Sequence, residues 1–484
     1  MDYKNYITKS AVKTEKLGLS DCVRRMKLVT LLAIILCFQS CKQNKPFDLA
    51  IVDANIFDAL TGTIIQNKTI LIRADTIANI IDRSEIFSAK KTINADGKLV
   101  TPGMIDTHIH LTFVFGDYEK APLSISGDTS KYYREKLTST YLPHGITTAM
   151  IMGQPEKWLE PTLFWMNNSS PEHIDIYTTG GALISKEDRK TYLNHVSVET
   201  PVLAKQKIEE YHNLGIEHIK LYWRLRQLEF KTAYKTADSL GMKIFGHIDN
   251  YVMFMDSTLK IGLTNYEHIF SISSSIIISQ NELNEFYHNY FDNYDKTQST
   301  FHIYQLELLR YLDENKTAEL NVLIDRLAEN KATFSTAIHL FAEKFGMTYY
   351  SDSFASNLSE SQTARCIENI KILMKYAKKM HDKGINIRIG TDCEHGGKAF
   401  QSEQLLLYEH GFSVSDILKI STINGAIDLN MEEKYGSVTI GKKANLIIYN
   451  QNPFEDYKNF LSKKLVIKDG VEYSPPQSLN FTKQ

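Results

Sequence analysis

The sequence predicts an α/β protein, with a TIM-like (β/α)8 barrel and a small β-sandwich domain formed by the two ends of the chain. Through the middle of the chain, eight short apolar segments alternate with longer helical stretches. Strand–helix alternation favours parallel βα units, and eight such units favour a closed barrel. Short β patterns at both ends of the chain predict the additional domain.

The N-terminal segment has the features of an export signal. The segment Arg24-Arg25-Met26-Lys27, with three basic residues, precedes an apolar run at residues 28–38, which is followed by Gln39, Ser40 and Cys41. A basic segment before a short apolar run is typical of a signal peptide. The run is too short for a membrane-spanning helix, which needs about 20 residues. We therefore expect export without a transmembrane anchor.

The end of this segment resembles the lipobox of bacterial lipoproteins. On this resemblance, residues 1–41 are a leader and lipoprotein signal peptide, and lipid on Cys41 anchors the protein to the membrane. The alternative is a plain signal peptide with an incidental cysteine. Both interpretations place the protein in the periplasm or cell envelope. The polar stretch before Met26 also suggests that translation starts there, and not at Met1.

Residues 48–97 and 432–475 are expected to form the composite β-sandwich domain. The first range contains several brief strand patterns, separated by turn signals such as Asn67-Lys68. A matching pattern returns only in the second range. Alternating apolar residues bounded by turn residues indicate strands. We predict that the two ranges pair with each other.

The barrel is assigned to residues 98–431. Its eight strand candidates cover residues 100–111, 146–153, 174–181, 217–223, 243–249, 264–270, 332–341 and 386–392. A helical insert at about residues 271–330 interrupts the regular spacing after the sixth candidate. Because active sites of such barrels lie where strands end, the insert is either a lid over the substrate or a peripheral decoration.

Composition excludes several classes of function. The chain has 484 residues, and its 55 Lys+Arg and 57 Asp+Glu leave a net charge of −2. This balance provides no general attraction to nucleic acid. The five cysteines form no CxxC pair, which argues against a zinc ribbon or a dithiol redox site. We expect no structural role for disulfides.

The first barrel strand carries His108 and His110, which are separated by one residue. On a strand, this spacing places both side chains on the same face. If that face points into the barrel, two neutral imidazoles converge where a divalent transition metal can bind. Two histidines alone are a weak indication, so further ligands are needed.

Four further candidate ligands stand at the ends of later strand candidates: Lys220, His247, His268 and Asp392. Each has a structural alternative, namely a satisfied buried histidine, a surface lysine or a helix N-cap. Catalytic residues of barrels come from the carboxyl ends of several strands, and these residues share that placement. The joint pattern predicts a metal-dependent catalytic site.

These segments resemble the amidohydrolase superfamily, in its imidazolonepropionase-like and prolidase-like branch. The resemblance extends from about residue 48 to 460 and rests on PGMIDTHIHL, GITTAM, IKLYW, GHID, YEHIF and IGTDCEHGG. It includes the tail from ISTINGAIDL to YGSVTIGKKANLIIYNQNPF, which carries no metal chemistry. The resemblance implies one or two divalent ions, with zinc expected, and these metal ligands: His108, His110, Lys220, His247, His268 and Asp392.

Lys220 needs a modification to act as a ligand, because an ammonium group has no lone pair for a cation. The family carboxylates this lysine with CO2, so the resemblance implies an N6-carboxylysine that bridges both metals. Lys220 lies in an apolar strand candidate. Desolvation there favours the neutral amine that the reaction with CO2 requires.

The ligand set predicts hydrolysis by hydroxide. Two cations acidify a bridging water, and one of them polarises the substrate carbonyl. Asp392 is the predicted catalytic residue, because a carboxylate beside that water can take its proton and pass it to the leaving nitrogen.

Substrate contacts are expected from Tyr222, Arg224, Arg226 and His395, which follow the predicted ligands closely. An arginine would suit a substrate carboxylate. The structural alternatives are a solvated helix start for the first three and an ordinary loop position for His395.

The predicted function is metal-dependent hydrolysis of a C–N bond in a small amide, cyclic amide or dipeptide. A lactone, ester or phosphotriester hydrolase is an alternative, since the same water attack serves those substrates. A non-catalytic periplasmic binding lipoprotein is another, but it would need two lobes and a hinge. A third is a family member degenerated to binding, although no ligand position is replaced. Substrate choice depends on loops, and any oligomeric state fits the sequence.

Overall fold

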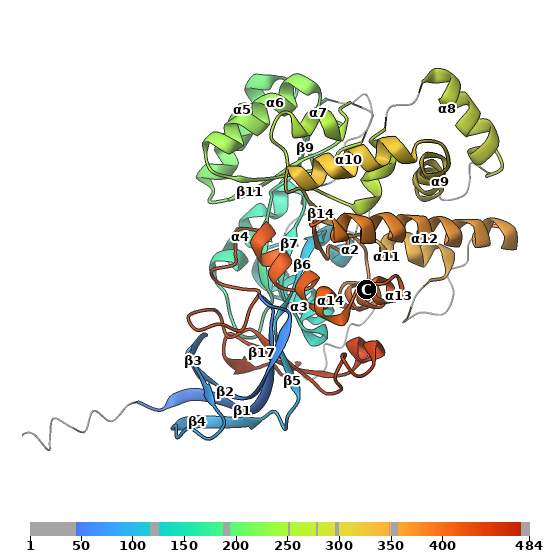
Figure 1. Cartoon of the computed structure of the whole chain (residues 1–484). Coiled ribbons are helices and arrows are strands. Elements are labelled where there is room, and N and C mark those ends of the chain that lie inside the picture. The colour runs from blue at the N-terminus through green and yellow to red at the C-terminus, as the bar shows by residue number, and fades with distance from the viewer. Residues whose placement is uncertain are drawn as a thin grey trace, which may run out of the picture. The chain divides into compact units, whose positions relative to one another are not determined.

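The computed structural model describes residues 45–116, 125–186, 194–249, 252–276, 279–295, 300–347, 349 and 357–475 (Figure 1). Phe47–Gln484 form one compact unit, distinct from Met1–Pro46. The expected leader, the lipidated Cys41 and the proposed start at Met26 lie outside the described residues. Within the described ranges, no helix combines the length and apolar character needed to cross a membrane.

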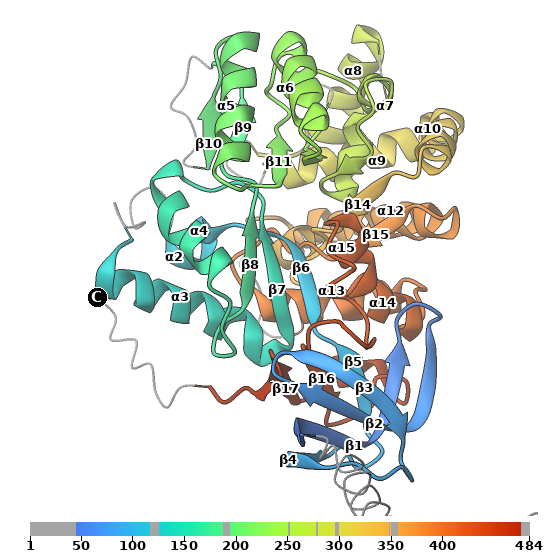
Figure 2. The same cartoon turned by 90° about the vertical axis from the view of Figure 1, so that its left-hand side faces the viewer.

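Strands from both ends of the chain pair in one eight-stranded sheet, the end sheet (Figures 1 and 2). Its order is β18-β17-β16-β5-β1-β2-β3, and β4 pairs with β1. The strands are β1 Phe47–Asp58, β2 Thr63–Arg73, β3 Thr76–Asp82, β4 Ala89–Asn94, β5 Leu99–Pro102, β16 Leu446–Tyr449, β17 Lys464–Lys468 and β18 Val471–Glu472.

The end sheet has a hydrophobic core of its own, to which both ends of the chain contribute. The core includes Ile51 and Ile70 from the N-terminal strands and Leu446 and Ile467 from the C-terminal ones. Antiparallel pairing of β16 with β5 places Leu446 opposite Pro102. The predicted pairing of the two ends is therefore seen, while the stacking of two sheets that a sandwich requires stays a prediction.

The middle of the chain forms parallel strands in two groups, ordered β6-β7-β8 and β10-β9-β11-β12-β13-β14-β15. Six residues of β7 are all buried, as expected for a parallel strand covered on both faces. The strands are β6 Met104–Ile109, β7 Ile146–Ile151, β8 Asp175–Thr178, β9 Ala182–Ile184, β10 His195–Ser197, β11 His218–Leu221, β12 Lys243–Gly246, β13 Asn265–Tyr266, β14 Thr333–Ser335 and β15 Asn386–Arg388.

Backbone hydrogen bonds link the last parallel strand to the first. Thr107 N donates to Ile389 O at 2.9 Å, and Asp392 N donates to His108 O at 2.9 Å. On the other side, β8 runs into β9 within a few residues, and Thr179 N donates to Ile151 O at 3.1 Å. The α/β fold is confirmed, and these bonds favour the closed barrel that the sequence predicts.

Helices follow the parallel strands, and their starts obey capping rules. Thr200 Oγ1 accepts from Leu203 N at 3.2 Å, and Pro201 occupies the first turn of α5. Ser359 and Gln362 form a capping box at α12. The longer helices are α3 Gly127–Tyr141, α4 Leu159–Asn167, α5 Pro201–Asn213, α6 Gln227–Ser239, α12 Glu360–Asp382, α13 Gly397–Glu409, α14 Val414–Ile420 and α15 Ile423–Asp428.

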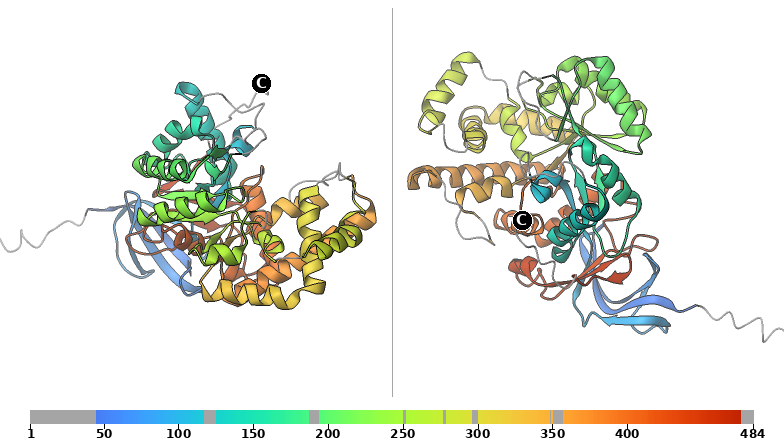
Figure 3. Two further views of the ribbon diagram at one scale, coloured as in Figure 1. Left: turned by 90° about the horizontal axis from the view of Figure 1, so that it is seen from above. Right: turned by 180° about the vertical axis from the view of Figure 1, so that it is seen from behind.

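The insert after β13 is helical, as predicted. Figures 1 and 3 show its yellow helices beside the orange α12, which α9 contacts. An aromatic cluster that includes Phe286, Tyr304 and Tyr311 holds the insert together. Its elements are the 3-10 helix η3 Ile269–Ser274, α8 Gln280–Phe286, the π-helix η4 Tyr287–Phe291, α9 Thr300–Asn315 and α10 Thr317–Glu329.

The expectation of one strand over residues 100–111 is wrong. The segment divides into β5, which belongs to the end sheet, and β6, which begins the parallel series. The division falls at Gly103, where an added Cβ would lie 2.1 Å from Thr147 Oγ1. Local apolar character does not reveal this change of partner.

Of the cysteines among the described residues, Cys366 and Cys393 are free and buried.

Candidate metal centre

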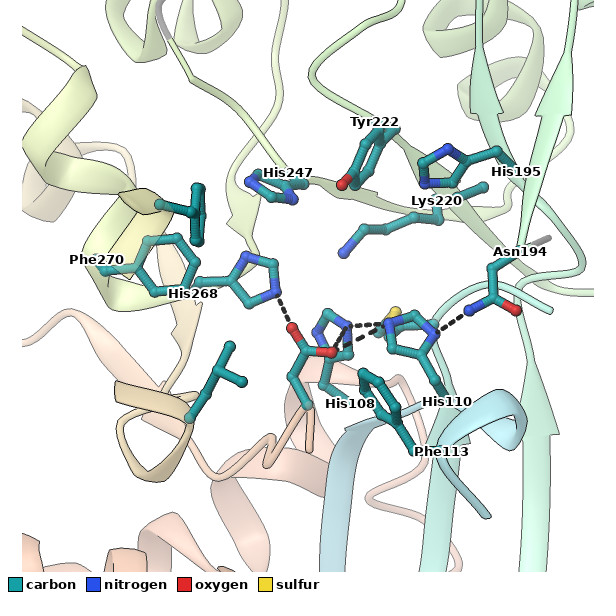
Figure 4. Close-up of a pocket in the computed structure, with 15 residues that line it drawn as sticks. His108, His110, Phe113, Asn194, His195, Lys220, Tyr222, His247, His268 and Phe270 are labelled. Carbon is teal, nitrogen blue, oxygen red and sulfur yellow. Dashed lines mark hydrogen bonds and ion pairs between the residues drawn. The ribbon is translucent and has the colours of Figure 1, made fainter. Parts of the chain in front are cut away.

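All six predicted metal ligands line one cavity of about 190 Å³ at the ends of the parallel strands (Figure 4). The sequence places these residues on separate strands, and the structure brings them together. The lining residues are His108, His110, Phe113, Met152, Ala182, Asn194, His195, Lys220, Tyr222, His247, His268, Phe270, Phe301, Leu340 and Asp392.

His108 and His110 each bind an acceptor through Nδ1. His108 Nδ1 lies 2.5 Å from Glu267 Oε2, and His110 Nδ1 lies 3.0 Å from the carbonyl oxygen of Gly153. Burial lowers the pKa of His108 to about 3, so this ring is neutral at pH 7. Because Glu267 only accepts, the proton of the neutral His108 ring is on Nδ1, and its Nε2 presents a lone pair. His110 Nδ1 also lies 3.4 Å from Asn194 Nδ2, but the closer carbonyl favours the tautomer with the proton on Nδ1, which leaves a lone pair on Nε2.

Asp392 adds a carboxylate to these lone pairs. The two Nε2 atoms of His108 and His110 are 3.2 Å apart. Asp392 Oδ1 lies 3.1 Å from His110 Nε2 and 3.6 Å from His108 Nε2. Three acceptor atoms thus face one another without a proton between them.

A divalent cation would remove this conflict between acceptors. The ligand atoms of His108, His110 and Asp392 lie within 4.8 Å of one another, as do those of His108, Glu267 and His268. Neutral imidazole and carboxylate ligands suit zinc and related transition metals. The residues present therefore fit the metal that the sequence predicts.

His268 and His247 complete the histidine cluster. His268 Nε2 lies 3.0 Å from Asp392 Oδ2, and the His247 and His268 rings are 4.5 Å apart. His268 has φ +68° and Asp392 has φ +46°, which non-glycine residues adopt rarely. Backbone strain of this kind concentrates at functional sites. A hydrogen bond of 2.9 Å from His268 N to Ser335 Oγ helps to hold the unusual backbone conformation of His268.

Lys220 is a ligand candidate whose surroundings do not satisfy the hydrogen-bonding capacity of its amine. It lies on β11, its side chain is 2% exposed, and Figure 4 shows its amine directed toward the histidines. Among the described residues, Nζ has no hydrogen-bond partner. Burial lowers the pKa of Lys220 to about 8, although Glu267 and Asp392 oppose the effect. A buried amine without a partner is unfavourable unless something else is bound there.

Glu267 positions His108 and was not singled out by the sequence. It is fully buried, and it accepts hydrogen bonds from Ser335 Oγ at 2.5 Å and Arg388 Nη2 at 2.6 Å. Arg388, also buried, makes a second ion pair with Asp428. Carboxylates that bind the outer nitrogen of a ligand histidine orient its ring. The available signal was the position of Glu267 directly before His268.

The predicted substrate contacts differ in whether they line the cavity. Tyr222 lines the cavity, whereas Arg224, Arg226 and His395 are absent from its described lining. The guanidinium of Arg224 lies 3.8 Å from the Trp223 ring centre. Arg226 binds Glu229, and His395 Nε2 lies 3.2 Å from Glu343. The side chains of Arg224 and His395 are therefore directed to neighbours outside the cavity wall.

Asn194 and His195 line the cavity and were missed from the sequence. Asn194 Nδ2 donates to Thr112 Oγ1 at 2.9 Å, and the His195 ring packs 4.3 Å from that of Tyr222. They stand just before and at the start of the short strand β10. No motif marks them, because only the fold brings β10 to the cavity.

Comparison with known proteins defines the class of this chain. The sequence profile of the amidohydrolase family matches residues 99–250 and 269–472, so the chain belongs to the amidohydrolase family. The predicted membership of this family is confirmed, and with it the prediction of an enzyme that is a hydrolase.

Individual relatives are distant. An imidazolonepropionase of Treponema denticola is 22% identical over 403 residues, which are 75% of this chain and 79% of the relative. An adenine deaminase of Bdellovibrio bacteriovorus is 27% identical over 154 residues, covering 31% of this chain and only 26% of that protein. The structure of a Xaa-Pro dipeptidase with bound methionine superposes with a TM-score of 0.61 at 18% identity, over 88% of this chain and 99% of the other. This last likeness shows the shared fold.

Proposed function

We propose that this protein hydrolyses a C–N bond of a small amide, cyclic amide or dipeptide-like substrate with the help of a divalent metal. The observation that carries the proposal is the group of facing acceptor atoms on His108, His110 and Asp392 beside the partnerless Lys220. The names of the relatives, an imidazolonepropionase, an adenine deaminase and a Xaa-Pro dipeptidase, support action at C–N bonds. An eight-stranded barrel is the scaffold we propose for the site.

The metal would be held by the four histidines, by Asp392 and by Lys220 once this lysine is carboxylated. When bound, it supplies Lewis acidity and makes water a nucleophile near neutral pH. Zinc is the ion we expect. The low pKa of Lys220, about 8, provides a fraction of neutral amine for carboxylation at neutral pH.

Asp392 is the proposed proton carrier. Its carboxylate is ionised, lies 14% exposed in side-chain area, and contacts three of the histidines. A carboxylate in this place takes a proton from the attacking water and delivers it to the leaving nitrogen. Glu267 holds the ring of His108 through Nδ1 and so keeps its Nε2 directed into the cavity.

We also propose that the protein is exported and lipid-anchored at Cys41. The basic and apolar order of residues 24–38 supports this. Labelling with a palmitate analogue should mark the native protein and leave a Cys41→Ala variant unlabelled. Absence of label from both would argue for a plain signal peptide, and equal labelling of both would argue for lipid at another residue. Recovery of residues 1–25 in an N-terminal peptide would exclude the start at Met26.

The experiment that tests the function is metal analysis of the purified protein alongside an activity screen. The substrates are N-acyl amino acids, Xaa-Pro dipeptides, cyclic ureides and lactones. We expect one or two metal ions per chain and turnover of at least one C–N substrate, lost with a chelator and restored by metal. Turnover of lactones alone would identify an ester hydrolase, and a metal-free, inactive protein would support a binding role.

A further inference from the structure

The cavity lining mixes polar and apolar side chains, and one apolar ring adjoins a predicted metal ligand. Asn194 and His195 lie on one side of the histidine cluster, and Phe270 lies on the opposite side (Figure 4). Phe270 stacks on His268, with ring centres 4.8 Å apart and an interplanar angle of 10°. Its ring therefore stands directly beside a predicted metal ligand, where a substrate group next to the reacting bond would lie.

Two further apolar residues extend the surface of Phe270, and we name the three together the apolar wall: Phe270, Phe301 and Leu340. The Phe270 and Phe301 rings are 5.8 Å apart and nearly perpendicular, an arrangement that aromatic pairs prefer. Phe341 packs behind both, with ring centres 4.6 Å from Phe270 and 6.4 Å from Phe301. The wall thus has solid support from α11 His339–Ala342.

Phe301 is the outermost residue of the wall. It is 45% exposed although its neighbours Phe270 and Phe341 are buried. It stands at the start of α9, so the insert supplies this part of the cavity. Covering its ring with another apolar group would remove apolar area from water, which is favourable.

The exposed part of the apolar wall suits an aromatic or branched aliphatic group. The volume of about 190 Å³ belongs to the whole cavity, which must also hold the metal and the scissile bond, so the group would extend from the metal ligands onto Phe301, which is 45% exposed. We propose that the substrate carries an uncharged ring or branched chain next to the scissile C–N bond, and that this group packs on Phe270, Phe301 and Leu340. This inference rests on the proposed function and specifies its substrate class.

The test is a matched set of amides that differ in one group. On the acyl side they are phenylacetyl, acetyl and succinyl glycinamide, and on the amine side the N-acetyl derivatives of benzylamine, methylamine and β-alanine. On at least one side, the ring should raise kcat/KM over methyl by about ten-fold. The carboxylate members should be no better than the methyl ones. Equal rates, or preference for a carboxylate, would overturn the proposal.

Variants of Phe301 test whether the apolar wall causes the preference for a ring in the substrate. Phe301→Ala should lower the ring-to-methyl ratio of kcat/KM about ten-fold, and Phe301→Leu, which keeps apolar area, should retain most of it. Phe164→Ala is the matched control, since Phe164 is 60% exposed on α4 and is not part of the described cavity wall. An equal change of the ratio in the control would remove the assignment to Phe301.

Binding without turnover separates this inference from the proposed function. Saturation-transfer NMR with N-benzylacetamide and N-methylacetamide reports contact with the cavity even in an inactive protein. Ring binding that Phe301→Ala weakens, without hydrolysis of any amide, would retain the apolar wall and reject the amide hydrolase. Hydrolysis without ring preference would reject the wall and retain the hydrolase, and failure of both measurements would reject both.

Discussion

Two fully buried lysines in this protein have opposite environments. Lys468, at the end of β17 in the end sheet, is 0% exposed and binds Asp469 at 2.6 Å and Asp175 at 3.0 Å. Lys220, on β11 at the cavity, is 2% exposed and has no hydrogen-bond partner among the described residues. A buried charge needs partners. The paired lysine is therefore structural, whereas the unpaired one marks a place where chemistry or a ligand must complete the environment.

The same contrast extends to the carboxylates of the two regions. Asp175 receives hydrogen bonds from Lys468, Ser169 and Asn445, so its charge is compensated by donors. Asp392 faces the Nε2 atoms of His108 and His110, which present lone pairs in our assignment. The end sheet and its junction with β8 are complete as folded, whereas the proposed cation would complete the cavity.

The largest expected effect concerns Asp392. Asp392→Asn removes the proposed proton carrier while the histidines remain, so turnover should fall about 1,000-fold with most of the metal retained. The measurements are kcat on the best amide and metal content per chain. Asp313→Asn, on α9 and paired with Lys375, is a control that should keep normal turnover. Near-normal activity of Asp392→Asn would contradict its role as base.

Substitution of each buried lysine tests whether the environments of Lys468 and Lys220 differ in energy. Lys468→Met leaves the buried Asp175 without its cation, while Asp469 keeps Lys443, so the free energy of unfolding should fall by about 3–5 kcal/mol. Lys220→Met removes an amine that has no partner, so the metal-free protein should lose less than about 1 kcal/mol, yet activity should disappear. Urea unfolding of the metal-free variants gives both values. Similar losses of stability for the two variants would show that the environments are equivalent after all.

A smaller effect is expected from Glu267. Glu267→Gln weakens the hold on His108 Nδ1, so metal affinity should fall about 10- to 100-fold. Competition with a chelator measures this affinity. Glu229→Gln is the matched control, because Glu229 is a buried glutamate that binds Arg226 outside the cavity wall. If both variants keep the wild-type affinity, Glu267 has no positioning role.

Local patterns predicted much of the fold and six candidate ligands that line one cavity. Each predicted barrel strand range contains a parallel strand, because apolar runs between turn residues are a short-range property. His108 and His110 share the cavity because a strand repeats every two residues. The expected strand at 100–111 failed at Gly103, since two halves of one apolar run pair in different sheets. Pairing is a long-range property that the run does not contain.

The supporting residues of the site could not be found in the same way. Glu267 is 159 positions from His108, and Arg388 is 121 positions from Glu267. The apolar wall combines η3, α9 and α11, which no sequence motif connects. Arg224 suited a substrate carboxylate by chemistry alone, but its packing on Trp223 depends on the turn after β11.

Lys220 and Lys468 show most clearly what the sequence predicts and what only the tertiary structure reveals. Each stands in a short apolar strand, and the sequence around each lysine predicts burial equally well. The carboxylate Asp175 that satisfies Lys468 lies 293 positions away. The local order of the chain was enough to single out six candidate ligands, and the resemblance of its motifs to a known family predicted a hydrolase. Only the tertiary structure assigned the partners of each buried charge, because the strength of such interactions depends on distances that folding alone creates.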